Sequence, residues 1–255
     1  IDNYSKYGNM KKSYDKHPNY KFVKGDLKNI ELLKDLVKDC DQIVATAAKI
    51  GGISYFHEYA YDLISENEKI ISSTFDAAIH AFKNYNLKKI NVLSSSMVFE
   101  NSNIFPTSEG DQLICAPPSS TYGFQKLSTE YFAQGAWEQY KLPYTIIRPF
   151  NCIGIGEKKA LGDKEIRSGN IKLAMSHVIP DLIQKILKKQ YPLRILGDGS
   201  QIRHYTYGGD LAYGIRLCIE NDNSLNEDFN LSINKSTFVI ELAQLIWKKI
   251  KPEKE

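Results

Sequence analysis

A tyrosine four residues before a lysine can form a proton-transfer pair, because side chains four residues apart share one face of a helix. The sequence holds four such pairs, Tyr7/Lys11, Tyr20/Lys24, Tyr85/Lys89 and Tyr122/Lys126. Only Tyr122 opens a strongly amphipathic helical pattern and also follows a serine cluster, residues 94–96. An adjacent ammonium favours phenolate, so we expect Lys126 to lower the pKa of Tyr122. The phenol would then act as a general base, with a serine hydroxyl holding the substrate oxygen.

These side chains need a scaffold, and short apolar runs rich in β-formers alternate with longer helical patterns along the chain. We predict strands at residues 21–23, 42–46, 89–93, 144–148 and 229–233, and helices at 30–37, 67–82, 122–140, 179–189 and 238–250. Residues 151–170 are rich in glycine and charge and are expected to be irregular. The alternation predicts βαβ units and a parallel sheet. Open sheets of this kind bind ligands at the carboxyl ends of their strands.

The composition is that of an ordinary globular chain of one or two domains. Of its 255 residues, 42% are hydrophobic and 25% charged, and the formal net charge is +3. Its basic residues are dispersed, so nucleic acid is not expected as a partner. The four cysteines show neither disulfide nor zinc-site spacing, and no apolar run is long enough to span a membrane. We expect reduced thiols and a cytoplasmic location.

Ser95, Tyr122 and Lys126 resemble the Ser/Thr, Tyr and Lys triad of extended short-chain dehydrogenases/reductases that act on nucleotide sugars. The resemblance implies NAD as cofactor, a nucleotide-diphosphate sugar as substrate and a homodimer built on two helices. It also implies that Lys126 binds the nicotinamide ribose and that Ser95 hydrogen-bonds the sugar.

Further segments resemble the same family in order and spacing. The implied cofactor-binding residues, besides Tyr122 and Lys126, are Asp2, Asn3, Asp26, Leu27, Ala47, Lys49 and Pro149. The implied substrate-binding residues are Ser96, Asn151, His177, Val178 and Arg203. The carboxylate of Asp2 favours NAD over its 2′-phosphorylated form, because the phosphate would meet a negative charge.

The expected fold is a Rossmann-like doubly wound parallel sheet without its first strand and glycine-rich loop. That loop precedes the ribose-binding acid by about 20 residues in the family pattern, and here the acid is Asp2. We expect residues 1–150 to form an N-terminally incomplete NAD-binding domain. Residues 151–255 are expected to form mainly a substrate-binding region, with elements returning to the main sheet. We also expect an incomplete copy of a longer enzyme that holds NAD poorly by itself.

The residues after the catalytic serine bear on the reaction. Family 4,6-dehydratases carry Asp-Glu where this chain has Ser96 and Met97. Fucose-synthase-like 3,5-epimerases carry a cysteine at the position of Met97 and a histidine like His177, with Cys152 or Cys115 as conceivable substitutes. We therefore predict 4-epimerisation through a transient 4-keto sugar. An NADPH-dependent 3,5-epimerase/reductase, a dehydratase and a non-catalytic family member remain as alternatives.

Overall fold

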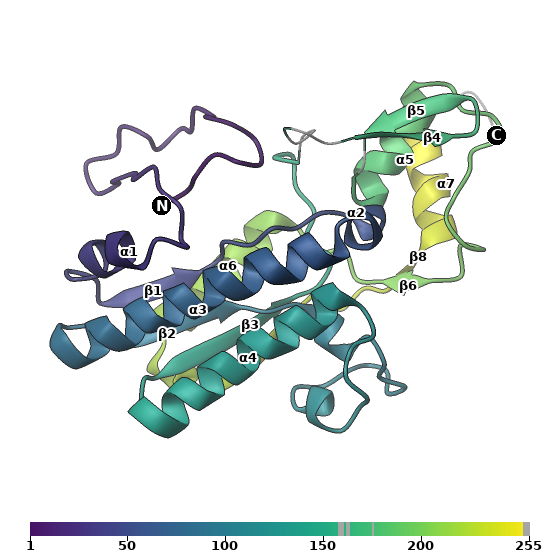
Figure 1. The fold of residues 1–255 in the computed structure, drawn as a ribbon. Coiled ribbons are helices and arrows are strands. Elements are labelled where there is room, and N and C mark those ends of the chain that lie inside the picture. The colour runs from purple at the N-terminus through teal and green to yellow at the C-terminus, as the bar shows by residue number, and fades with distance from the viewer. Residues whose placement is uncertain (158–160, 162–163, 175, 252–255) are drawn as a thin grey trace.

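The computed structural model describes residues 1–157, 161, 164–174 and 176–251, without the side chains of residues 53 and 54. Within this part of the chain, a four-stranded parallel sheet forms the centre (Figure 1). Its order is β1 (Gln42–Ala45), β2 (Lys89–Leu93), β3 (Tyr144–Pro149) and β7 (Glu227–Leu231). All three pairings are parallel, so the carboxyl ends of the strands meet at one edge.

Two long helices cover one face of this sheet. They are α3 (Ala60–Asn84) and α4 (Thr121–Tyr140), which lie side by side in Figure 1. Their apolar stripes bury Phe75, Ala78 and Ala133 against Ile90 and Ile146 of the strands. The shorter α1 (Ile30–Leu36) packs on α3, and α6 (Gly208–Glu220) lies behind the sheet, against β3. The core therefore holds α4 rigidly above β2 and β3.

A smaller C-terminal lobe lies beyond the carboxyl end of the sheet (Figure 1). It contains the antiparallel hairpin β4 (Glu165–Ser168) and β5 (Ile171–Ala174), and the paired strands β6 (Ile202–Arg203) and β8 (Thr237–Phe238). Its helices α5 (Val178–Leu187) and α7 (Val239–Ile250) pack through their own apolar cluster. This lobe faces the end of the sheet at which ligands are expected.

Short elements connect the two parts. The helix α2 (Ile53–Glu58) follows the loop after β1, and the 3-10 helix η1 (Ser96–Phe99) follows β2. Two further 3-10 turns are η2 (Asp111–Leu113) and η3 (Asp222–Ser224). Both α2 and η1 therefore begin near the carboxyl edge of the sheet.

The predicted parallel sheet with flanking helices is confirmed. The strand predicted at residues 21–23 is wrong, because this segment contributes only an isolated bridge between Asp2 and Lys24. The helix α6 was not predicted, and β4 and β5 form a hairpin where irregular chain was expected over 151–170. Residues 158–160, 162 and 163 of that segment lie outside the described residues. Where the structure is described, no helix combines the length and apolar character needed to cross a bilayer.

Candidate active site

The first turn of α4 is fixed against the segment that follows β2. Ser120 caps the helix by accepting a hydrogen bond from the Gly123 amide at 3.0 Å. The Glu100 carboxylate in turn accepts hydrogen bonds from the Ser120 amide at 2.9 Å and its hydroxyl at 2.8 Å. A Cβ on Gly123 would lie only 2.7 Å from the carbonyl oxygen of Met97, so glycine permits this close approach. The start of α4 thus lies directly against η1.

This packing brings Ser95, Tyr122 and Lys126 together. The ammonium of Lys126 lies 6.0 Å from the centre of the Tyr122 ring, and the phenol shares a hydrogen bond with the Ser95 side chain. Lys126 Nζ also donates to the carbonyl oxygen of Leu93 at 2.8 Å, at the end of β2. Tyr122 is only 5% exposed and Lys126 only 8%. The three groups form a dry cluster that could exchange a proton with a bound hydroxyl.

The expected lowering of the Tyr122 pKa is wrong for the chain as it stands. Burial raises the pKa of Tyr122, and the hydrogen bond from Ser95 only partly opposes this effect. Burial also lowers the pKa of Lys126 to about 8, opposed by the negative charge of Glu130. Both shifts have one physical cause, since a low-dielectric site disfavours the charged form of each group. Burial therefore sets the direction of both pKa shifts.

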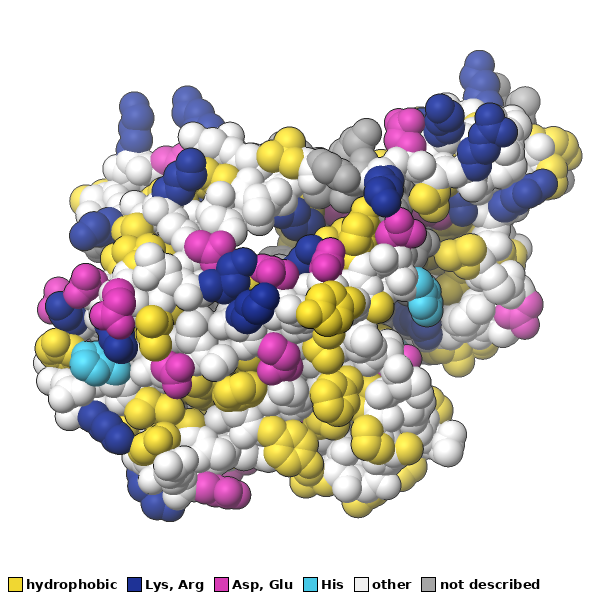
Figure 2. Space-filling view, in the orientation of Figure 1, with side chains coloured by type: hydrophobic (Ala, Val, Ile, Leu, Met, Phe, Trp, Pro, Cys, Tyr) yellow, Lys and Arg dark blue, Asp and Glu magenta, His cyan; other side chains and the backbone are white. Residues whose placement is uncertain are grey.

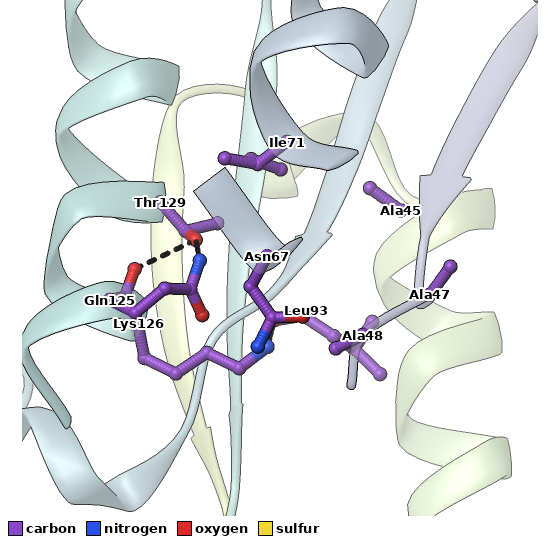
Figure 3. Close-up of a pocket in the computed structure, with 9 residues that line it drawn as sticks. All are labelled: Ala45, Ala47, Ala48, Asn67, Ile71, Leu93, Gln125, Lys126 and Thr129. Carbon is purple, nitrogen blue, oxygen red and sulfur yellow. Dashed lines mark hydrogen bonds between the residues drawn. The ribbon is translucent and has the colours of Figure 1, made fainter. Parts of the chain in front are cut away.

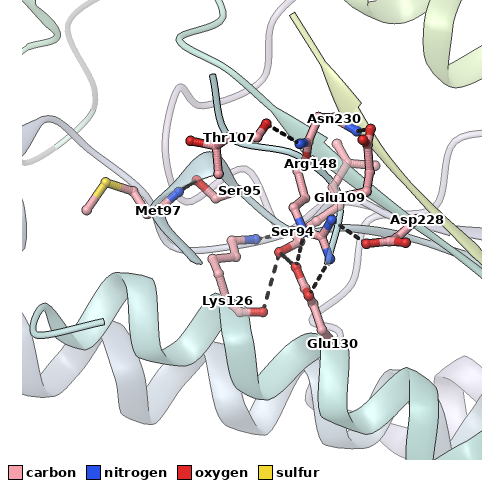
Figure 4. Close-up of polar contacts among 11 residues, drawn as sticks. Ser94, Ser95, Met97, Thr107, Glu109, Lys126, Glu130, Arg148, Asp228 and Asn230 are labelled. Atoms are coloured by element: carbon pink, nitrogen blue, oxygen red, sulfur yellow. Dashed lines mark hydrogen bonds and ion pairs between the residues drawn. The ribbon is translucent and has the colours of Figure 1, made fainter. Parts of the chain in front are cut away.

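A buried ion network lies directly behind this cluster (Figure 4). The guanidinium of Arg148 is 0% exposed and donates to both carboxylate oxygens of Glu130, from Nε at 2.7 Å and from Nη2 at 2.8 Å. Its remaining arm reaches Asp228 on β7, and Ser94 donates to Glu130. With Lys126, the site holds two cationic and two anionic side chains. Sequence reasoning missed this network, although an arginine within an apolar strand was an available signal.

Small side chains leave a cavity of about 10 Å³ beside Lys126 (Figure 3). The lining residues are Ala45, Ala47, Ala48, Asn67, Ile71, Leu93, Gln125, Lys126 and Thr129. The buried amide oxygen of Gln125 has no hydrogen-bond partner among the described residues. Nearby, Asn67 fixes the backbone of Lys49, accepting from its amide at 2.6 Å and donating to its carbonyl at 3.0 Å. Of the predicted cofactor residues, Ala47 lines the same cavity as Lys126. Lys49 follows on the same loop, where Asn67 fixes its backbone.

The other predicted cofactor residues form a second group. The amide of Asp2 donates to Val23 O at 3.2 Å, which places residues 1–3 beside residues 23–25. Asn3 Nδ2 then reaches the Asp26 carboxylate at 3.4 Å. A hydrogen bond from the Lys28 amide lowers the pKa of Asp26, so this carboxylate is anionic. Leu27 differs from these polar residues, because its partly buried side chain packs against the main hydrophobic core.

Among the predicted substrate residues, His177 has the most defined partner. Its Nδ1 lies 2.6 Å from Glu157 Oε1, which also accepts from the His177 amide at 3.3 Å. The hydrogen bond from His177 lowers the pKa of Glu157. Sequence reasoning missed Glu157 as this partner. Val178, next along the chain, begins α5 and packs its side chain against the apolar cluster of the C-terminal lobe.

The last predicted cofactor residue, Pro149, ends β3 opposite Leu231. The remaining predicted substrate residues are dispersed, and Asn151 donates to the carbonyl of His204 at 3.3 Å. Ser96 begins η1, next to Ser95. Arg203 is exposed on β6, where it donates to the neighbouring Ile202 carbonyl at 2.8 Å. Among the described residues, Arg203 makes no hydrogen bond or ion pair with Ser95, Tyr122 or Lys126.

Comparisons with known proteins show the family of the chain and its fold. A model of the NAD-dependent epimerase/dehydratase family matches residues 1–232. A putative UDP-glucose 4-epimerase of Methanocaldococcus jannaschii is 28% identical, over 92% of this chain and 69% of the relative. The GDP-L-fucose synthase of Escherichia coli is 24% identical, over 82% of this chain and 65% of the relative.

Among solved structures, a UDP-glucose 4-epimerase of Thermotoga maritima with UDP-glucose superposes with a TM-score of 0.75. It is 23% identical, and the match covers 96% of this chain and 72% of that one. At this identity the likeness shows the fold alone. The chain spans 59% to 69% of the length of the first curated relatives it matches.

Proposed function

Since the chain belongs to the NAD-dependent epimerase/dehydratase family, we propose that the protein is a nucleotide-sugar 4-epimerase with Tyr122 as its proton-transfer residue. One observation carries the proposal, which is the dry cluster of Tyr122, Ser95 and Lys126 at the carboxyl end of β2. A cytoplasmic location is part of the same proposal.

Two places in the structure offer polar groups that suit NAD. Near Lys126, the buried Gln125 amide oxygen has no hydrogen-bond partner among the described residues and lines a cavity of about 10 Å³, room for one small polar group. Asp2 and Asn3 offer a carboxylate and an amide that can bind ribose hydroxyls. Tyr122, Lys126 and these residues, together with Asp26, Leu27, Ala47, Lys49 and Pro149, are the proposed cofactor contacts. When bound there, NAD would supply a hydride acceptor and donor at carbon 4 of the sugar.

The catalytic side chains have separate roles in the proposed reaction. Tyr122 takes the proton of the sugar 4-hydroxyl, and Ser95 holds the same oxygen through a hydrogen bond. Lys126 stabilises the phenolate, since the attraction between opposite charges is strong in a site that excludes water. The 4-keto sugar then turns its other face to the site, and Tyr122 returns the proton. Ser96, Asn151, His177, Val178 and Arg203 are the proposed substrate contacts.

A second candidate is a 3,5-epimerase/reductase, and the pairing of His177 with Glu157 favours it. A carboxylate that holds Nδ1 fixes the imidazole tautomer and leaves Nε2 to exchange a proton. Met97, however, stands where that chemistry needs a second proton-transfer group, and a thioether cannot serve. The same position disfavours 4,6-elimination, which needs an acid and a base after Ser95.

The reaction in heavy water separates these candidates. The purified protein is incubated with NAD and UDP-glucose, and the product is analysed by mass spectrometry and NMR. A 4-epimerase returns the same hydride, so the product should carry no carbon-bound deuterium, whereas deuterium at carbon 3 or 5 would exclude direct return. Tyr122→Phe should lower kcat by about 10²- to 10⁴-fold, the usual contribution of general acid–base catalysis.

We also propose that the protein forms a homodimer through the exposed side of α3 and α4. A groove of about 380 Å³ runs between these helices, lined by apolar residues that include Phe75, Ile79 and Phe132. Hydrophobic side chains gather over the same helices in Figure 2. Tyr131, which lines this groove, is 59% exposed, and Phe124, two turns earlier on α4, is 50% exposed. Large apolar side chains exposed together in this way are typical of an interface.

A further inference from the structure

The helix α2 lies over the ring of Tyr122. The rings of Phe56 and Tyr122 are stacked, with centroids 4.4 Å apart and planes inclined by 13°. Together with the hydrogen bond to Ser95 and the packing of α4, this contact leaves Tyr122 only 5% exposed. General acid–base catalysis requires the substrate oxygen within about 2.6–3.2 Å of the phenol. While Phe56 is stacked on the ring, little of Tyr122 is open to a sugar.

Contacts with the C-terminal lobe hold α2 in this position. Glu58, at its last turn, pairs with Lys164 at 2.8 Å. At its other end, Gly52 lies so close to the lobe that a Cβ would be 2.5 Å from the Ser176 carbonyl oxygen. The helix therefore bridges the C-terminal lobe and the Tyr122 ring.

The local stability of α2 is low for physical reasons. It has six residues, begins at Gly52 without a side-chain cap, and joins α3 through the single residue Tyr59, so it is the exposed N-terminal end of a longer helical run. Away from that junction it is held by Phe56, by the exposed pair of Glu58 with Lys164, and by the contact of Lys164 with the Tyr59 ring. Segments with so few buried contacts open locally more readily than the core.

We propose that Phe56 controls access to the Tyr122 phenol, moving away with α2 to admit a sugar and returning to stack on the ring. The role of the sugar rests on the proposed function, whereas the movement of Phe56 does not. Phe56 is thus a positioning residue that acts through Tyr122. Because α2 also contacts the C-terminal lobe, a substrate bound between the lobe and the sheet would move both together.

Nitration by tetranitromethane tests this proposal without NAD or sugar. The reagent modifies accessible tyrosines, and peptide mass spectrometry reads the rate at each site. A minor state in which Phe56 has moved away typically has a population of about 0.1–10%, and Tyr122 would be nitrated only in that state. Because Phe56→Ala removes the covering ring, Tyr122 should be nitrated about tenfold faster or more in this variant. The matched control is His57→Ala, which truncates an exposed neighbour on the same helix and should leave this rate unchanged.

Two internal references separate access from general loosening. Tyr131, 59% exposed, should react at one rate in every variant, and half-buried Tyr144 on β3 should also keep its own rate in every variant. Phe56→Leu keeps an apolar side chain of similar volume and should give an intermediate rate at Tyr122. Glu58→Gln, a surface change that leaves the core intact, should give a smaller increase at Tyr122 alone.

Equal Tyr122 rates in the parent, Phe56→Leu and Glu58→Gln would overturn the proposal, even if Phe56→Ala did not fold. A parallel increase at Tyr122 and Tyr144 would overturn it as well, because it would report global opening. Failure of the proposed function would look different. The sugar reaction would then be absent or independent of Tyr122, while the nitration pattern stayed as expected.

Discussion

At the scale of the residue, the main physical feature of the site is that its ionisable groups are kept away from water. Burial raises the pKa of Tyr122 and lowers the pKa of Lys126, so it favours the neutral form of each group. The ion network of Arg148, Glu130 and Asp228 supplies a net negative charge close to the ammonium. This charge opposes the desolvation of Lys126, so the lysine is still largely protonated at neutral pH, below its pKa of about 8.

The free energy of unfolding should depend on pH through the ionisation of Lys126. Its folded pKa of about 8 lies below the ordinary 10.5, so between these values the unfolded chain holds a proton that the folded chain lacks. The free energy of unfolding should therefore rise with pH across this window, by up to about 3 kcal/mol relative to Lys126→Met. Urea unfolding of both proteins between about pH 7 and pH 9.5 measures the difference in unfolding free energy. This pH range lies below about 10, the ordinary pKa of tyrosine. A constant difference over this range would contradict the assignment.

Arg148 allows a direct test of the buried network. Replacing it in Arg148→Met leaves the carboxylates of Glu130 and Asp228 without their partner, and breaking a buried pair costs about 3–5 kcal/mol. Chemical denaturation should show this loss. The matched control is Arg216→Met, because Arg216 and Glu220 form an exposed i,i+4 pair on α6, where about 0.5 kcal/mol or less is expected. Similar losses in the two variants would argue against a special role for the buried pair.

The pair that we propose as catalytic was chosen from the sequence because local context distinguishes Tyr122 from three other tyrosines with the same spacing. The direction of the Tyr122 pKa shift could not be predicted from the sequence, because it depends on how completely the ring is buried in the fold. Phe56 supplies part of that cover but lies 66 positions before Tyr122 in the sequence. Nothing in the residues around it indicates that the two rings stack. Glu157, the partner of His177, was missed for the same reason.

At the scale of the element, α4 is positioned by its first turn. Gly123→Ala should push α4 away from η1, since its Cβ would meet Met97 O and Pro118 Cβ at 2.7 Å each. We expect a loss of about 1–3 kcal/mol, as for other overpacking changes. Gly135→Ala on the same helix meets nothing within 4 Å and should instead stabilise by up to about 1 kcal/mol through helix propensity. Thermal unfolding of both variants measures the contrast, and a shift of the same sign in both would count against the packing argument.

Long periodic elements could be predicted, and short ones set by tertiary contacts could not. The residues of α4 and β2 match their predicted ranges to within one position, because β-forming residues dominate β2 and α4 begins at the Ser120 cap and carries no proline. The helix α2 has six residues and relies on Phe56 and Glu58 for its position. The strand β4 lies within the stretch 151–170, whose glycine and charge content indicated loop, and its pairing with β5 gave no local signal.

At the scale of the molecule, the order of strands explains why residues distant in sequence form one site. Because β2, β3 and β7 are parallel neighbours, Ser94, Arg148 and Asp228 lie on adjacent strands or just past a strand end. The return of β7 to the sheet after the C-terminal lobe also ties the two parts together. The division into residues 1–150 and 151–255 stays a prediction.

The proposed dimer is the prediction that depends on the whole molecule. Tyr131→Asp places a charge on the exposed α3–α4 face, and burying an unpaired carboxylate in an interface is costly. Light scattering after gel filtration should show a dimer for the parent and a monomer for this variant, with unchanged helix content by circular dichroism. Tyr213→Asp is the matched control, because Tyr213 is 61% exposed on α6, behind the sheet, and should remain dimeric. A monomeric parent at micromolar concentration would contradict the prediction, since an obligate interface of two helix pairs would stay associated there. Dissociation in both variants would instead place the interface elsewhere than on α3 and α4.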